Sequence, residues 1–137
     1  MASAIRGVDY FYATVEAQPG EGYQLLSELA SLGVNLLAFT SVPVGPTRTQ
    51  LALFPQDAPK LVDAARKAGL ALDGPHPALL VQGDDELGVL AGIHQKLSQA
   101  GVNVYASSAV TDGRGNFGYI IYVRPEEYQR AATALEV

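Results

Sequence analysis

Glycine-containing loops and two asparagines are the residues of this chain whose types and spacing suit small-molecule binding. Gly20 and Gly88 each precede an amphipathic stretch, and glycine lets the backbone approach a ligand closely. The first N–H groups of a helix lack intrahelical partners, so they attract a carboxylate. Asn35 and Asn103 each follow a Gly-Val pair and offer an amide donor and a carbonyl acceptor. Together these groups suit the carboxylate and the ammonium of a free amino acid.

Both loops carry acidic residues beside the glycine. The first has only Glu21, whereas the second has three consecutive acids, Asp84, Asp85 and Glu86, which could receive an ammonium group. A structural explanation stays open, because glycines make tight turns and acids stabilise helix N-termini without any ligand. The sequence does not say which copy would bind. The candidate ligand-binding residues are Gln18, Pro19, Gly20, Glu21, Asn35, Asp85, Glu86, Leu87, Gly88 and Asn103.

Other patterns suggest chemistry that their context does not support. Residues 113–118 match the G-x-G-x-x-G dinucleotide pattern, but that pattern needs a following helix, and here a strand-like stretch follows. His76 and His94 stand apart, the chain has no cysteine, and adjacent acids point in different directions, so no metal site is predicted. No Ser-His-Asp arrangement can be assigned. We therefore expect no cofactor, no metal and no catalytic residue.

Composition limits the class of protein. Apolar residues make up 48% of the 137 residues and the mean hydropathy is +0.12, which indicates a folded chain. No apolar run approaches the length of a membrane-spanning helix, and the N-terminus lacks the apolar core of a signal peptide. The formal charge of −5 opposes nucleic-acid binding. The sequence predicts a soluble, cytoplasmic protein.

The chain repeats itself at an offset of 68 residues. Gly33-Val34-Asn35 recurs as Gly101-Val102-Asn103, and the offset aligns residues 9–69 with residues 77–137 without a gap. Nine of the 61 aligned pairs are identical, and eight of these lie within residues 20–45. Because the apolar pattern also matches along the whole alignment, we interpret the repeat as the duplication of one structural unit.

Each copy predicts the same order of elements. Aromatic and β-branched residues predict a first strand at residues 10–15 and at residues 78–82. Apolar stripes then predict a helix that ends at Gly33 or Gly101, where glycine favours the left-handed conformation. A hairpin and a second helix follow, at residues 35–54 and 59–68 in the first copy and at residues 103–123 and from 125 onward in the second. Residues 70–72 would add a short last strand to the first copy.

The fold class that follows is α+β, with two tandem ferredoxin-like β-α-β-β-α-β modules and antiparallel sheets. We place the first module at residues 1–73, a linker at residues 74–77 and the second module at residues 78–137. Gly69 matches Val137 at this offset, so the second module is predicted to lack its own last strand. Residues 4–8 are the candidate for that place. An uncovered edge there would favour pairing with a second chain, so we expect a homodimer.

Motifs around the first helix of each copy resemble the ACT domain. In the first copy they are Gln18-Pro19-Gly20 and the run from Leu29 to Asn35. In the second copy they are residues 84–90 and the run from Leu97 to Asn103. The resemblance covers nearly the whole chain as two tandem modules, with no attached catalytic domain.

What the resemblance implies is regulation. ACT modules are small-molecule sensors, often of amino acids, and their effectors bind near the turn between the first strand and the first helix, often between modules. The chain would then be a stand-alone, non-catalytic, allosteric protein whose partners are an amino acid and a metabolic enzyme. Two alternatives stay open. One is a regulatory subunit that only dimerises or binds a partner enzyme, and the other is a small isomerase or monooxygenase, for which His94 is the sole nominee.

Overall fold

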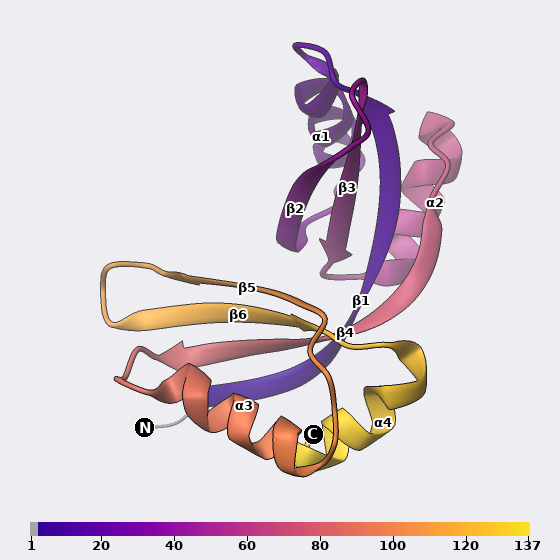
Figure 1. Ribbon diagram of the computed structural model, residues 1–137. Helices are drawn as coiled ribbons and strands as arrows, with labels where there is room; N and C mark the ends of the chain where they lie inside the picture. Colours follow the sequence, from indigo (N-terminus) through magenta and orange to yellow (C-terminus); the bar gives the residue numbers. More distant parts are fainter. Residues whose placement is uncertain (1–2) are drawn as a thin grey trace. The chain divides into compact units, whose positions relative to one another are not determined.

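A computed structural model describes residues 3–137 of the chain (Figure 1). Strands and helices follow one another in the predicted order within each copy of the repeat. The elements are β1 (Ser3–Glu16), α1 (Glu21–Ser31), β2 (Leu36–Val44), β3 (Arg48–Pro55), α2 (Ala58–Ala68), β4 (Asp73–Asp84), α3 (Val89–Gln99), β5 (Ala106–Thr111), β6 (Asn116–Tyr122) and α4 (Pro125–Ala134). None of the helices within residues 3–137 is long and apolar enough to cross a membrane.

The chain forms two compact units. One comprises Asp9–His76, and the other comprises Pro77–Val137 together with the N-terminal residues up to Val8. The hydrogen-bonded strand order is β2-β3-β1-β4-β6-β5, so each unit has a four-strand order that uses part of β1 and part of β4. The hairpin strands β2 and β3, and likewise β5 and β6, pair antiparallel. The predicted α+β, ferredoxin-like fold class is confirmed.

Apolar side chains that alternate along the strands and repeat along the helices make a separate core in each unit. The first core contains Phe11, Leu53 and Leu61, each no more than 2% exposed. The second contains Leu79, Val81, Ile121 and their neighbours on α3 and α4. Leu79 and Ile121 are fully buried. Burial of this kind is the main favourable contribution to folding, because it removes apolar surface from water.

The N-terminal strand supplies the strand that the second repeat lacks, as the sequence indicated for residues 4–8. Ile5 packs against the core of the second unit. Gly7 lies against α4 so closely that a Cβ built on it would stand 1.9 Å from the Tyr128 hydroxyl oxygen. Any larger residue at this position would force the Tyr128 side chain or the strand to move. The N-terminal strand therefore covers the edge of the second unit's sheet that would be open without it.

The end of the first repeat differs from the prediction. Residues 70–72 do not form a strand, and the segment predicted as a linker at residues 74–77 belongs to β4, which begins at Asp73. Gly74, Pro75 and Pro77 suggested a break in the chain. The pairing of β4 with β6 begins only at Leu79, so Pro75 and Pro77 lie where β4 has an open side, and proline is tolerated at such an edge because a missing N–H costs nothing there.

Hydrogen bonds at the end of the first helices confirm the repeat. Val34 donates its N–H to the carbonyl of Leu29, and Val102 donates to Leu97 in the same way. The preceding glycines, Gly33 and Gly101, have φ of 81° and 73° and so adopt the predicted left-handed conformation. This is the Schellman arrangement that ends a helix.

The second helices, by contrast, match at an offset of 67. Leu70 donates to the Ala65 carbonyl and Val137 donates to the Ala132 carbonyl, so the gap-free alignment is wrong at its end. Counted from the equivalent strand residues Leu53 and Ile121, the chain reaches the N-cap of α2 at Asp57 one residue later than it reaches the N-cap of α4 at Arg124.

Candidate functional site

The two predicted loops have the same backbone shape. Gly20 and Gly88 stand immediately before α1 and α3 with φ of 91° and 83°, and neither helix has a side chain that caps its N-terminus. Ala17 donates its N–H to the Thr47 carbonyl and Asp85 donates to the Gly115 carbonyl, which ties each loop to the turn of its own hairpin. The sequence therefore located two equivalent turns correctly.

The acidic residues of the second loop do not lie on the helix. Asp84 is the last residue of β4, Asp85 and Glu86 belong to the connection, and the first turn of α3 contains no acid. Glu86 accepts a hydrogen bond from the N–H of Val89 through its backbone carbonyl. The interpretation of three acids at a helix start is wrong, because the helix begins only after Gly88.

The structure separates the asparagines from the loops. Gly20 precedes α1 and Asn35 follows it, so the two residues lie at opposite ends of an 11-residue helix. At 1.5 Å per residue the helix is about 16 Å long, which is longer than an amino acid. The same separation holds for Gly88 and Asn103 across α3. One ligand cannot contact a loop and an asparagine of the same unit, so the candidate residues form separate groups.

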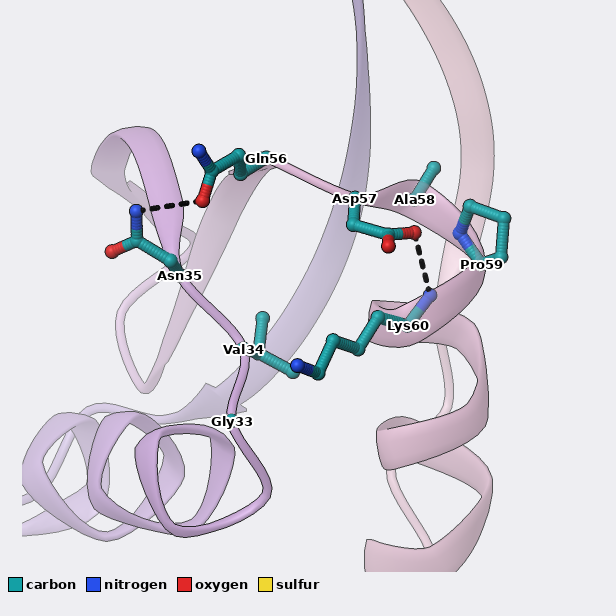
Figure 2. A pocket seen from close by; sticks show the side chains of 8 residues that line it. All are labelled: Gly33, Val34, Asn35, Gln56, Asp57, Ala58, Pro59 and Lys60. Atoms are coloured by element: carbon teal, nitrogen blue, oxygen red, sulfur yellow. Dashed lines mark hydrogen bonds between the residues drawn. The ribbon is translucent and has the colours of Figure 1, made fainter.

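Asn35 lies in a cavity of about 550 Å³ in the first unit (Figure 2). A volume of this order is usual for small-molecule sites. The side-chain amide of Asn35 donates to the Gln56 side-chain oxygen at 3.1 Å, and Gln56 donates its backbone N–H to the Asn35 carbonyl. The other lining residues are Gly33, Val34, Asp57, Ala58, Pro59 and Lys60.

Lys60 and Asp57 place opposite charges on this cavity. The Asp57 carboxylate accepts the backbone N–H of Lys60 at 3.2 Å and so caps α2. Lys60 extends across the cavity towards Gly33, and its Nζ lies 3.1 Å from where a Cβ of that glycine would stand (Figure 2). The ammonium forms no ion pair with the part of the chain that the structure describes. An exposed ammonium next to amide groups is suited to an anionic group.

The corresponding region of the second unit contains a carboxylate of the protein itself. The N–H of Asn103 donates to Glu127 Oε1 at 3.0 Å, and the Arg130 guanidinium donates to the Gly101 carbonyl at 3.1 Å. The side chain of Asn103 was predicted to hold a ligand. In the structure it is the backbone of this residue that has an anionic partner.

Two further cavities lie near the other candidate residues. One of about 160 Å³ is bordered by Glu21 on α1. Another, of about 410 Å³, lies along the β5–β6 hairpin and includes Asp112. Backbone N–H groups of Arg114 and Asn116 donate to the Asp112 carboxylate, and these hydrogen bonds lower its pKa, the Arg114 bond having the largest effect. Asp112 therefore stabilises the turn in which the G-x-G-x-x-G pattern falls, and the prediction of a hairpin there is confirmed.

The two histidines each contact tyrosine side chains. His94 is exposed on α3, and its Nε2 forms a hydrogen bond with the hydroxyl of Tyr119. His76 packs against Tyr10 and Tyr12, with ring centroids 5.3 Å from each. The small-enzyme alternative required a deep pocket with a histidine or a carboxylate of perturbed pKa, and His94, its one nominee, is exposed. No group of three or more His, Cys, Asp and Glu side chains within residues 3–137 is close enough to hold a metal ion.

Gln56, Asp57 and Lys60 are the polar cavity residues that were absent from the predicted ligand-binding residues. Their signal was weak, because a lysine in the first turn of a surface helix is ordinary. A comparison of the two repeats at the offset of 67 would have shown that the charge is reversed, from Lys60 in the first repeat to Glu127 in the second.

Searches of protein families and of curated proteins give no match. Solved structures, however, share the fold over almost the whole chain. A protein from Bacteroides thetaiotaomicron has a TM-score of 0.81 at 17% identity, covering 96% of this chain and 88% of its own.

Two regulatory subunits of aspartate kinase have the same fold. The one from Thermus thermophilus, solved in a ligand-free form, has a TM-score of 0.63 at 18% identity and covers 98% of this chain and 94% of its own. The one from Thermus flavus has a TM-score of 0.62 at 18% identity and covers 99% and 95%. At these identities the likeness shows the fold alone. The chain has the ACT-like fold that these regulatory subunits share.

Proposed function

We propose that this protein is a non-catalytic regulator that binds a small metabolite, an amino acid, and modulates a metabolic enzyme. The observation that carries the proposal is the fold, which matches a regulatory subunit of aspartate kinase over 98% of the chain. The cavity at Asn35 supports it, because Lys60 and Asp57 offer charges opposite to those of an amino acid zwitterion.

Regulation would follow from a difference in affinity. A ligand shifts a protein between two arrangements only to the extent that it binds one more tightly than the other. Residues on the two sides of the cavity come from the end of α1 and the start of α2, which are separated in the sequence. A ligand that contacts both segments would favour the arrangement in which they are close together.

A thermal-shift screen against the twenty amino acids tests the proposal. A ligand that binds only the folded chain stabilises it by about 2.7 kcal/mol at 100 times its Kd, which raises the Tm by roughly 5 to 10 °C for a chain of this size. We expect one amino acid, or a few related ones, to do so, with chloride salts at equal ionic strength as the control. An unchanged Tm with all twenty would contradict the amino-acid form of the proposal.

A second candidate function is that of an interaction module that dimerises or binds a partner enzyme. Its support is the exposure of apolar side chains on β2 and β5, the terminal strands of the hydrogen-bonded order. Val42, Val44 and Val110 are 50%, 47% and 72% exposed. Exposed strand edges pair readily with other chains.

Light scattering should therefore report a homodimer, and Val110→Lys or Val42→Lys should dissociate it. A monomer at all concentrations would exclude this pairing.

A further inference from the structure

The two units carry opposite charges at the same place on their second helices. Asp57 and Arg124 are the N-caps of α2 and α4, and Lys60 and Glu127 are each the third residue after the cap. The backbone hydrogen bonds at the ends of these helices show the same correspondence, at an offset of 67. Lys60 is thus the counterpart of Glu127.

In the second unit a carboxylate of the protein binds at the end of the first helix. Glu127 Oε1 accepts the Asn103 N–H at 3.0 Å, at the point where the chain leaves the α3 C-terminus. A hydrogen bond to a carboxylate is about twice as strong as one between neutral groups. The position beside this N–H therefore favours a carboxylate, and the second unit supplies its own.

The first unit has the same turn at the end of its first helix, where Val34 donates to the Leu29 carbonyl, but it has no carboxylate in that position. Lys60 cannot accept a hydrogen bond, and its ammonium lies beside Gly33 instead. The region beside Asn35 is the cavity of about 550 Å³. The nearby Asp57 carboxylate is directed to the backbone N–H of Lys60, which it caps. The first unit thus combines a place suited to a carboxylate with an unpaired cation.

We propose that a carboxylate from solution binds in this cavity, beside the Asn35 N–H and the Lys60 ammonium, where Glu127 binds in the second unit. The inference rests on the proposed function and makes it specific: the first unit is the one that binds, and the ligand is an α-amino acid held through its carboxylate. The ammonium of the ligand faces Asp57. The second unit is closed to such a ligand because Glu127 occupies the equivalent position.

Amide chemical shifts of the ¹⁵N-labelled full chain test this assignment. The probes are glycine, acetate and methylammonium, each as a chloride or sodium salt at matched ionic strength. We expect glycine and acetate to shift the amide signals of Asn35 and Lys60, with glycine the tighter ligand. Methylammonium, which has no carboxylate, should leave these signals unchanged.

Three variants separate binding at this cavity from binding elsewhere. Lys60→Met keeps the aliphatic stem and removes the charge, and it should weaken glycine binding about tenfold or more. Lys60→Glu should supply an internal carboxylate, as Glu127 does, and abolish binding. Glu127→Gln, a matched change of charge in the second unit, should leave the affinity for glycine within about twofold. Lys60 is exposed, so neither of its substitutions disturbs the core, and the amide oxygen that Glu127→Gln introduces can still accept the Asn103 N–H.

The outcomes distinguish this inference from the proposed function. If an amino acid binds but shifts only the amides of the loops at 18–22 or 84–88, and Lys60→Glu has no effect, the inference is overturned and the proposed function stands. If acetate shifts the Asn35 amide although glycine does not and no amino acid raises the Tm, the carboxylate site stands and the amino-acid sensing role fails. If neither probe shifts the Asn35 amide at high concentration, the inference is overturned.

Discussion

Replacement of Gly7 by alanine should destabilise the protein through the packing of the N-terminal strand on α4. The added Cβ would stand 1.9 Å from the Tyr128 hydroxyl oxygen and 3.2 Å from the Cζ atom of the ring. Carbon atoms in contact normally lie about 3.5 to 4.0 Å apart, so the strand or the ring must move by more than 1 Å. Overpacking of this kind typically costs about 1 to 3 kcal/mol, and we expect a loss of about 2 kcal/mol in the free energy of unfolding.

Urea denaturation of four proteins measures this effect: the wild type, Gly7→Ala, Tyr128→Phe and the double variant. Removing the hydroxyl leaves the ring carbon at 3.2 Å as the nearest obstacle, so alanine at position 7 should cost at least about 1 kcal/mol less in the phenylalanine background. Gly22→Ala is the control for added bulk: a Cβ there meets no atom within 4 Å, and alanine in α1 should leave stability unchanged or raise it by up to about 1 kcal/mol. If Gly7→Ala leaves stability unchanged, or costs the same in both backgrounds, the N-terminal strand does not pack on α4 as described.

Three other predictions concern single residues. Gly88→Ala should destabilise the protein by about 1 to 2 kcal/mol because φ is 83°, whereas Gly92→Ala within α3 should stabilise it by up to about 1 kcal/mol; thermal melts compare the two. Leu79→Ala should cost about 2 to 5 kcal/mol in urea denaturation, since this side chain is fully buried in the core. The pKa of Asp112, measured by carboxyl NMR, should lie below its ordinary value because the Arg114 N–H stabilises the ionised form. Its stabilising effect is present above the unfolded pKa of about 3.9 and is lost as the pH falls through the lower folded value, and Asp112→Asn should abolish this pH dependence.

Local signals allowed most of the fold to be predicted. The Gly-Val-Asn motifs marked helix ends because a left-handed residue there favours glycine, and φ at Gly33 and Gly101 confirms it. Asp112-Gly113 marked a hairpin for a similar reason. These features depend on a few neighbouring residues, so one sequence is enough to find them.

Local patterns do not determine which segments of β1 and β4 belong to which unit. Gly74 and Pro75 carry the signature of a turn, yet they lie in β4, because strand pairing is decided by distant partners. Gly74 packs so closely on Phe11 that a Cβ there would stand 2.9 Å from the ring. Only the tertiary structure shows that this close approach, rather than a turn, explains the glycine.

The candidate site was predicted only in part. Asn35 was chosen for its side chain, and it does line the cavity. Lys60 was missed because its role depends on the N-cap of α2 lying one residue later in its repeat than the N-cap of α4 does, which a gap-free alignment hides. The proximity of Gln56 and Asn35, 21 positions apart, is likewise a property of strand pairing and not of either residue.

Calorimetric titration of the full chain with the amino acid that raises the Tm most tests the central claim directly. The protein is predicted to bind one molecule per chain, and Lys60→Glu is predicted to give no heat of binding at the same concentrations. Two molecules per chain, or an unchanged isotherm with Lys60→Glu, would contradict the assignment of the site to the first unit. The absence of heat with every amino acid would contradict the sensing role itself.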